Sequence, residues 1–493
     1  MTNKYKWYTF VTCQKNIIGN FYKNIGLLLI LNALIKPFGL YLESLVHKSL
    51  GQEIWGTYAA LNSIAFVLVF LTDPGINQFV TKTIAESPDL LRKIFPNLFV
   101  YKLIILPVYP IVFITLAYVL GFRDEDLIIA LIISGIYILI NITGFMRASL
   151  QGHQLFSQDA WASNFDKLTL SILILVMFQT GTCSLENFVS IKFLSVAITV
   201  LLLFWLLIKN KIWIKPKLHK KHAIMFASMS APFAWMTILY SANERIDMIM
   251  IHELHSAYET GIYNAAYRIL DAAMMYLWVI LPFFFAKLAH FDSTDEEKDK
   301  LINNGTAITA TPLIILSVFS FFYGENLFFM FSQSKPEDII YMKEYFIILS
   351  TSLLIHGFFA ILSTYLTSNG HTRFVNKMIF ISILLNLTLN YFFIPQFGGK
   401  AAAITTLISS SFLSFSYISY IKRRTNIKFP LKTWGILLFI SLAGFCTYSI
   451  GELIHLHWIV NSLIASTIML SISLITKIIR FNNMFKEDFN VTT

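Results

Sequence analysis

Charged side chains that interrupt long apolar runs are the first candidates for chemistry in this sequence. Lys36 follows about a dozen mostly apolar residues. A charge at such a position is costly inside a membrane and marks a functional site by default. Since an ammonium group binds phosphate as a point charge, we expect Lys36 to hold an anionic group of a substrate. The alternative is a lysine paired with a carboxylate for packing. Lys192, near the outer end of a later apolar run, is expected to extend to the membrane surface.

Two short charged motifs provide further candidates. Glu244, Arg245 and Asp247 lie at the end of one apolar run, and Arg268 and Asp271 lie within the next. Residues three positions apart share a helix face, and neighbouring carboxylates in a low-dielectric site suit coupling to protons or cations. We therefore expect Glu244, Asp247 and Asp271 to couple ions and Arg245 and Arg268 to bind substrate. The alternatives are a hydrated helix end for the first motif and a structural ion pair for the second.

The composition indicates that these charges belong to a polytopic membrane protein. Of the 493 residues, 56% are hydrophobic and 13% are charged, about half the charged share of a globular protein. This composition excludes an ordinary soluble enzyme, a disordered chain and a fibrous protein. Because a membrane-spanning helix needs about 20 apolar residues, the apolar residues suffice for about fourteen spans.

The apolar runs are continuous rather than alternating, which predicts an all-α protein and not a membrane β-barrel. The predicted spans are residues 24–44, 55–73, 98–121, 127–147, 168–181, 187–208, 223–249, 262–287, 305–324, 344–367, 374–394, 400–421, 433–452 and 457–478. With the N-terminus inside, 29 Lys and Arg residues fall inside and 5 fall outside. This asymmetry predicts that both termini are cytoplasmic. It also accounts for the net charge of +10 without a nucleic-acid partner.

Two short motifs recur across the halves of the chain. Residues 56–60 (GTYAA) resemble residues 261–266 (GIYNAA), and residues 152–156 (GHQLF) resemble residues 370–374 (GHTRF). Both pairs are separated by six predicted helices, so each repeat keeps its orientation in the membrane. Such parallel repeats are typical of transporters with two pseudo-symmetric bundles that alternate access to a midplane cavity.

This repeat predicts the domain organisation. Residues 1–208 form the first six-helix bundle, and residues 209–222 form a basic cytoplasmic linker. Residues 223–425 form the second bundle, and residues 426–493 add two helices and a tail. The three cysteines, Cys13, Cys183 and Cys446, are far apart and predict neither a disulfide framework nor a metal site. No dinucleotide, P-loop or zinc-protease motif is present, so we expect a transporter without a cofactor rather than an enzyme.

Several motifs in order resemble the polysaccharide-flippase branch of the multidrug/oligosaccharidyl-lipid/polysaccharide exporter superfamily. They are residues 73–78 (DPGINQ), 147–152 (RASLQG), 259–268 (ETGIYNAAYR), 386–395 (NLTLNYFFIP) and 398–403 (GGKAAA). The resemblance covers about residues 20 to 425. Repeat-unit flippases of this branch are usually drawn with twelve helices, and fourteen is more typical of lipid II flippases.

The resemblance implies a flippase of the bacterial inner membrane. Its substrate would be an undecaprenyl-pyrophosphate-linked oligosaccharide for O-antigen, capsule or exopolysaccharide synthesis, held in a cationic lumen. The implied partners are this lipid-linked glycan, membrane lipids, a polysaccharide polymerase and its chain-length machinery. Two alternatives stay open, a lipid II flippase of peptidoglycan synthesis and a cation-coupled multidrug exporter. The exporter predicts an acidic cavity, which Lys36 and Arg268 disfavour.

Overall fold

The fold is helical throughout the described part of the chain. The computed structural model describes residues 35–72, 99–100, 102–153, 155–212, 238–239, 241–289, 294–331 and 335–479. No β-strand occurs in these ranges, and eleven of their helices are long and apolar enough to cross a membrane. The prediction of an all-α polytopic membrane protein is therefore confirmed. Each of the fourteen predicted spans overlaps a helix.

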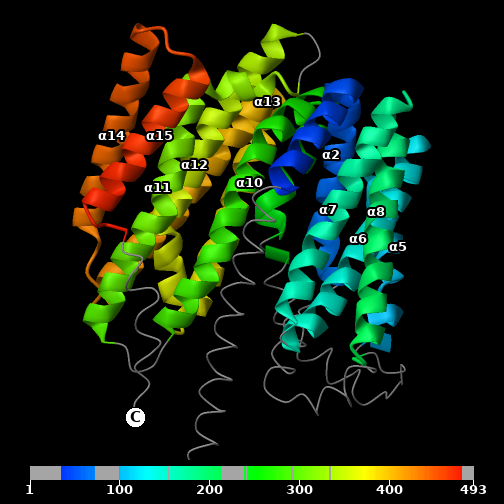
Figure 1. The fold of residues 1–493 in the computed structure, drawn as a ribbon, viewed down its shortest axis with the longest axis horizontal. Coiled ribbons are helices and arrows are strands. Elements are labelled where there is room, and N and C mark those ends of the chain that lie inside the picture. The colour runs from blue at the N-terminus through cyan, green and yellow to red at the C-terminus, as the bar shows by residue number, and fades with distance from the viewer. Residues whose placement is uncertain are drawn as a thin grey trace, which may run out of the picture. The chain divides into compact units, whose positions relative to one another are not determined.

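The chain divides into two compact units, residues 1–249 (unit 1) and 250–493 (unit 2). The division lies in a helix over residues 241–254, whereas the sequence suggested a linker at 209–222. Most of that linker is outside the described residues, so the two six-helix bundles and the appended pair stay a prediction. Figure 1 shows the helices of both units.

The first described helix of unit 1 covers residues 35–50. The helices that follow are α2 (Gln52–Val67) with the short 3-10 turn η1 (Leu68–Leu71), α5 (Val108–Val119), α6 (Glu125–Gly152), α7 (Phe156–Gln179) and α8 (Leu185–Lys209). The core is aromatic at one end, where fully buried Trp55 packs against Tyr58 and Phe188. At the other end, Met146 and Leu150 of α6 pack with Leu203 and Leu207 of α8.

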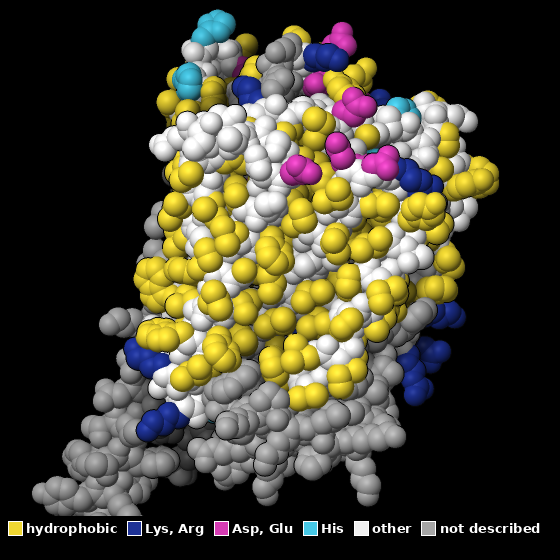
Figure 2. Space-filling model, turned by 90° about the vertical axis from the view of Figure 1, so that its right-hand side faces the viewer, with side chains coloured by type: hydrophobic (Ala, Val, Ile, Leu, Met, Phe, Trp, Pro, Cys, Tyr) yellow, Lys and Arg dark blue, Asp and Glu magenta, His cyan; other side chains and the backbone are white. Residues whose placement is uncertain are grey.

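Unit 1 has the surface expected of a membrane-embedded bundle. Ile111 and Val119 of α5 and Leu201 of α8 are among its most exposed side chains. Figure 2 shows hydrophobic side chains across a broad band of one face, with most of the charged side chains gathered beyond the margins of this band. Large apolar side chains left exposed in this way find their favourable surroundings in lipid.

Unit 2 contains longer helices, several with caps that define their first turns. They are α10 (Ala257–Leu288), α11 (Asp295–Phe328), α12 (Pro336–Ser368), α13 (Thr372–Arg424), α14 (Leu431–Leu453) and α15 (Trp458–Ile475). Ser256 caps α10, and Thr294 with Glu297 forms a capping box at α11. The last two helices pack against α11 around Tyr448 and Met469, neither of which is exposed.

The 53-residue helix α13 is two helices joined by a sharp break. Gly398 has a φ of 54°, outside the helical region. Across the break, Thr405 donates a hydrogen bond to Asn390 Oδ1, and Ser382 Oγ donates to Ser409 O at 3.3 Å. In a straight helix Asn390 and Thr405 would be about 22 Å apart, so the chain folds back on itself. This hairpin accounts for the two predicted spans at 374–394 and 400–421.

Candidate functional site

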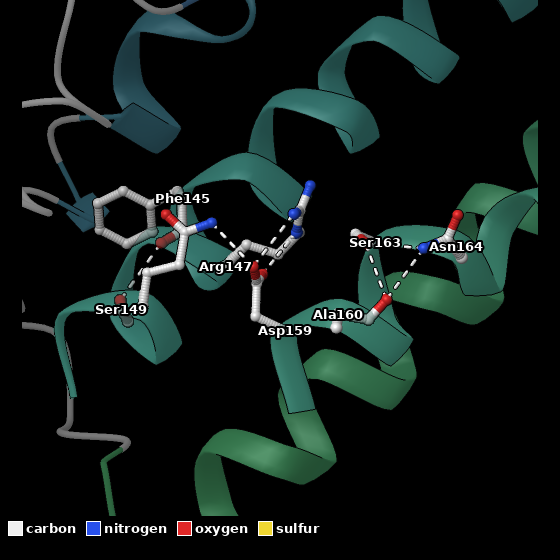
Figure 3. A network of polar contacts seen from close by, with 8 residues as sticks. Phe145, Arg147, Ser149, Asp159, Ala160, Ser163 and Asn164 are labelled. Atoms are coloured by element: carbon white, nitrogen blue, oxygen red, sulfur yellow. Dashed lines mark hydrogen bonds and ion pairs between the residues drawn. The ribbon is translucent and has the colours of Figure 1, made fainter. Parts of the chain in front are cut away.

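A partly buried ion pair joins the last turns of α6 to the first turn of α7 in unit 1. Arg147 Nε donates to Asp159 Oδ1 at 2.7 Å, and Arg147 Nη2 donates to Asp159 Oδ2 at 3.2 Å. Gln151, one turn after Arg147 on the same helix face, donates to Asp159 Oδ2 at 2.9 Å. Figure 3 shows Arg147 and Asp159 facing each other between the two helices. Both carboxylate oxygens are thus satisfied by donors from α6.

Two further cations lie near this ion pair. Lys36, on the helix over residues 35–50, interacts electrostatically with Lys167, Arg147 and Asp166. Lys167 also pairs with its neighbour Asp166 at 3.3 Å. In the same region a Cβ on Gly39 would lie 3.9 Å from Ser171 Oγ of α7, so these two helices are close together. We call Lys36, Arg147, Asp159, Asp166 and Lys167 the unit 1 charge cluster.

The cluster corrects the predicted position of Lys167. The predicted spans 127–147 and 168–181 leave Lys167 in an inside loop between them, but α7 begins at Phe156. Lys167 is therefore about 17 Å along the helix from its start, within the candidate span Ser157–Gln179. Arg147 likewise lies inside α6, about 8 Å from its end. Four residues of this cluster were not predicted as site residues from the sequence, namely Arg147, Asp159, Asp166 and Lys167. Two signals could have indicated the Arg147–Asp159 pair: the motif that begins at Arg147, and the acidic residue that follows the short turn after it.

Lys36 differs from the other two cations of the cluster. It is partly buried, and no hydrogen bond or ion pair joins its ammonium group to another of the described residues. Its predicted depth in the membrane depends on residues before 35, which lie outside the described ranges. With three cations and two carboxylates, the cluster carries a net positive charge and is suited to an anion.

The other predicted site residues are distributed over both units. Glu244, Arg245 and Asp247 lie on the helix over 241–254, where Arg245 stacks over the Phe66 ring at 5.2 Å. Asp247 is only 5% exposed. Arg268 and Asp271 lie on α10 in unit 2 and are partly exposed. The roles of these five residues in substrate binding and ion coupling stay predictions.

Lys192 does not extend to the membrane surface as expected. Its ammonium group donates to Tyr58 OH at 2.8 Å and lies 5.9 Å from the centre of the Phe188 ring. It also interacts electrostatically with Glu43, which is 8% exposed. Aromatic groups and a buried carboxylate on neighbouring helices provide better partners than the more distant headgroup region.

In unit 2 the motif residues meet at the break in α13. Glu259 Oε1 accepts hydrogen bonds from the Gly399 backbone N–H at 3.0 Å and from Tyr345 OH. A Cβ on Gly398 would lie 2.9 Å from the same Glu259 oxygen. The motifs 259–268 and 398–403 are therefore parts of one contact that joins α10, α12 and α13. We call Glu259, Tyr345, Gly398 and Gly399 the hairpin latch.

The first pair of repeated motifs lies at equivalent positions of two helices. Gly51 and Ser256, 205 positions apart like the first pair of motifs, are the N-caps of α2 and α10. Tyr58 and Tyr263 occupy equivalent positions one to two turns later, and both are buried. The motif 73–78 lies outside the described residues.

Comparisons with known proteins identify relatives of this chain. Residues 21–285 match the family model described as polysaccharide biosynthesis protein, and residues 297–392 match the MatE model. An uncharacterised membrane protein of Methanocaldococcus jannaschii is 23% identical over 73% of this chain and 88% of its own length. The capsular polysaccharide biosynthesis protein CapF of Staphylococcus aureus is 25% identical over 67% of this chain and 83% of its own length. The probable low-salt glycan biosynthesis flippase Agl15 of Haloferax volcanii is 22% identical over 47% of this chain and 45% of its own length.

Solved structures share the fold at low sequence identity. The lipid II flippase MurJ in an inward closed conformation has a TM-score of 0.72 and 16% identity, covering 92% of this chain and 99% of that one. An inward-facing multidrug transporter of the MATE family has a TM-score of 0.60 and 12% identity, covering 78% and 94%. The first family match covers more than half of the chain. The protein therefore belongs to the polysaccharide biosynthesis protein family, within the superfamily of polysaccharide flippases and multidrug exporters.

Proposed function

We propose that this protein translocates undecaprenyl-pyrophosphate-linked oligosaccharide repeat units across the bacterial cytoplasmic membrane for surface polysaccharide synthesis. The observation that carries this proposal is the unit 1 charge cluster, in which Lys36, Arg147 and Lys167 outnumber the carboxylates inside a family whose relatives include a glycan flippase and a capsule protein. A pyrophosphate is the part of such a substrate that needs cations. The glycan and the prenyl chain do not.

The cluster suggests how the substrate enters. Arg147 and Asp159 lie close to the ends of their helices, and Lys167 lies deeper along α7. The headgroup would meet the guanidinium group first and the two ammonium groups next. Arg245 and Arg268 are proposed to bind the same phosphates at other stages of alternating access, and Glu244, Asp247 and Asp271 to couple the movement to an ion gradient. The protein acts as a transporter and forms no covalent intermediate with its substrate.

The distribution of Lys and Arg supports a proposed membrane topology. With both termini cytoplasmic, the ends of α6 and α7 near Arg147 face the side on which lipid-linked oligosaccharides are made. A polysaccharide polymerase and its chain-length machinery would use the product on the opposite side. We propose both as partners of this protein.

A lipid II flippase is the second candidate, because the MurJ fold aligns over nearly the whole chain. It would use the same phosphate site with a different glycan. A cation-coupled drug exporter is less compatible with a cluster of net positive charge, since its cationic substrates require carboxylates.

A deletion strain tests the proposal and separates these candidates. We expect the complete prenyl-pyrophosphate repeat unit to accumulate in membrane extracts, surface polysaccharide to disappear and growth to continue. Accumulation of lipid II with loss of viability would support the second candidate instead. Altered drug sensitivity alone, with normal glycan lipids, would contradict both flippase assignments.

A further inference from the structure

Arg147, a candidate to bind the substrate phosphates, is already paired with a carboxylate of the protein itself, that of Asp159. Asp159 contacts two nitrogens of the guanidinium group at 2.7 and 3.2 Å, as a bound phosphate would. We propose that Asp159 is an exchangeable counter-ion, which neutralises Arg147 in the empty transporter and gives way to the phosphate groups of the substrate. This inference rests on the proposed function, since it takes a diphosphate as the ligand.

The guanidinium group has room for a second anion. The side chain of Arg147 is 29% exposed, whereas that of Asp159 is 9% exposed. In Figure 3 one end of the Arg147 guanidinium points away from Asp159. Within the described ranges, Nη1 at that end makes no hydrogen bond. A phosphate can therefore approach the open edge before Asp159 leaves the other one.

The charge count of the cluster favours exchange over simple addition. Lys36, Arg147 and Lys167 carry three positive charges, and Asp159 and Asp166 carry two negative ones. A diphosphate that links a prenyl chain to a sugar carries two negative charges. If it joined the cluster as it stands, one uncompensated negative charge would remain in a low-dielectric region, which is costly. If Asp159 withdraws, the remaining charges balance.

The two carboxylates differ in how easily they can withdraw. Asp166 is the sequence neighbour of Lys167 and pairs with it at 3.3 Å on the same helix. Asp159 instead reaches across from α7 to α6, and only residues 153–155 connect these helices. A small relative movement of the two helices separates Asp159 from Arg147 but leaves Asp166 beside Lys167. Substrate binding is thereby linked to a movement between α6 and α7.

The test is a series of charge variants of the purified full-length protein, titrated with inorganic pyrophosphate by calorimetry in detergent. Asp159→Asn removes the competing charge at nearly constant shape, and we expect pyrophosphate to bind about tenfold more tightly. Gln151→Glu adds a carboxylate next to the same pair, and we expect binding about tenfold weaker. Glu325→Gln, which breaks an exposed ion pair with Lys343 in unit 2, is the control and should leave the affinity unchanged.

The outcomes distinguish this inference from the proposed function. Tighter binding by Asp159→Asn together with slower glycan export would support the exchange, because a residue needed only for folding would weaken both. If the unaltered protein binds pyrophosphate but Asp159→Asn binds it equally or more weakly, the counter-ion role is wrong while the phosphate site stands. If Asp159→Asn does not fold, an unchanged or higher affinity of Gln151→Glu overturns the inference. If the unaltered protein does not bind pyrophosphate, the phosphate site itself is wrong.

Discussion

Removal of the Glu259 side chain should destabilise unit 2 far more than removal of a neighbouring exposed carboxylate. Glu259 is the centre of the hairpin latch, where one oxygen accepts hydrogen bonds from the Gly399 N–H and from Tyr345 OH. A Cβ added to Gly398 would lie 3.1 Å from the Glu259 Cγ, so the α13 backbone at Gly398 passes very close to the Glu259 side chain. In Glu259→Ala both donors lose their charged acceptor in a partly buried site.

The magnitude follows from these two contacts. A hydrogen bond to a charged group contributes about 1.5–3 kcal/mol, so loss of both predicts about 3–6 kcal/mol. For a unit of roughly 250 residues, this corresponds to a fall in Tm of about 6–24 °C. Glu259→Gln keeps an oxygen acceptor and should lose less than half as much. The matched control is Glu344→Ala, which removes an exposed ion pair with Lys400 worth about 0–1 kcal/mol.

The assay is thermal unfolding of the purified full-length variants in one detergent, followed by intrinsic fluorescence. The expected order of Tm is unaltered protein and Glu344→Ala together, then Glu259→Gln, then Glu259→Ala. Equal Tm values for Glu259→Ala and Glu344→Ala would refute the reasoning, because the latch would then contribute no more than a surface ion pair. Normal surface polysaccharide in Glu344→Ala cells verifies that the control protein is folded and inserted.

Three further predictions concern other parts of the chain. Lys36→Ala and Arg268→Ala should each reduce glycan export at least about tenfold at normal expression, whereas Lys36→Arg should retain most of the export. The amount of surface polysaccharide measures export. Wild-type export in both alanine variants would contradict the role of these residues in phosphate binding. Gly398→Ala should lower stability by about 2 kcal/mol in thermal unfolding, because φ at this position is 54° and the new Cβ would lie 2.9 Å from a Glu259 oxygen. The control Gly435→Ala, whose new Cβ would have no atom within 4 Å, should be neutral or stabilising. Burial raises the pKa of the Cys183 thiol, so a smaller fraction of it is thiolate at neutral pH. Its labelling by an impermeant maleimide should therefore increase at a higher pH than the labelling of an ordinary cysteine. Labelling of Cys183 in intact cells would place it outside, as predicted, and labelling only after lysis would reverse the predicted topology.

Much of the fold could be predicted from the sequence because lipid imposes strong rules. Continuous apolar runs and the distribution of Lys and Arg predicted helices that overlap every observed one. The break in α13 was also predicted as a gap between two spans, since Pro395 and Gly398 interrupt the apolar pattern there. The start of α7 was predicted late, because more than half of residues 156–167 are polar or charged. Hydropathy finds the apolar part of a helix and not its polar first turns.

The site was harder to predict because it depends on which helices are neighbours. Lys36 was chosen for its apolar surroundings, but its electrostatic partners come from residues more than a hundred positions later. Lys192 was expected to reach the membrane surface, but it donates a hydrogen bond at 2.8 Å to Tyr58 OH, which is distant in sequence. Glu259 was noticed only as part of a motif, and its contact with Gly399 spans 140 residues. Contacts between residues so far apart in the sequence cannot be predicted from the pattern of a short segment.

The central claim is that this chain moves a lipid-linked oligosaccharide across a membrane, and reconstitution tests it most directly. The purified protein is placed in sealed vesicles that carry a prenyl-pyrophosphate oligosaccharide in both leaflets, and an impermeant glycan-cleaving enzyme is added outside. We predict that the fraction protected from cleavage falls towards zero with the unaltered protein and stays at the level of empty vesicles with Lys36→Ala. Equal protection in vesicles with and without the unaltered protein, at verified insertion, would contradict the flippase assignment.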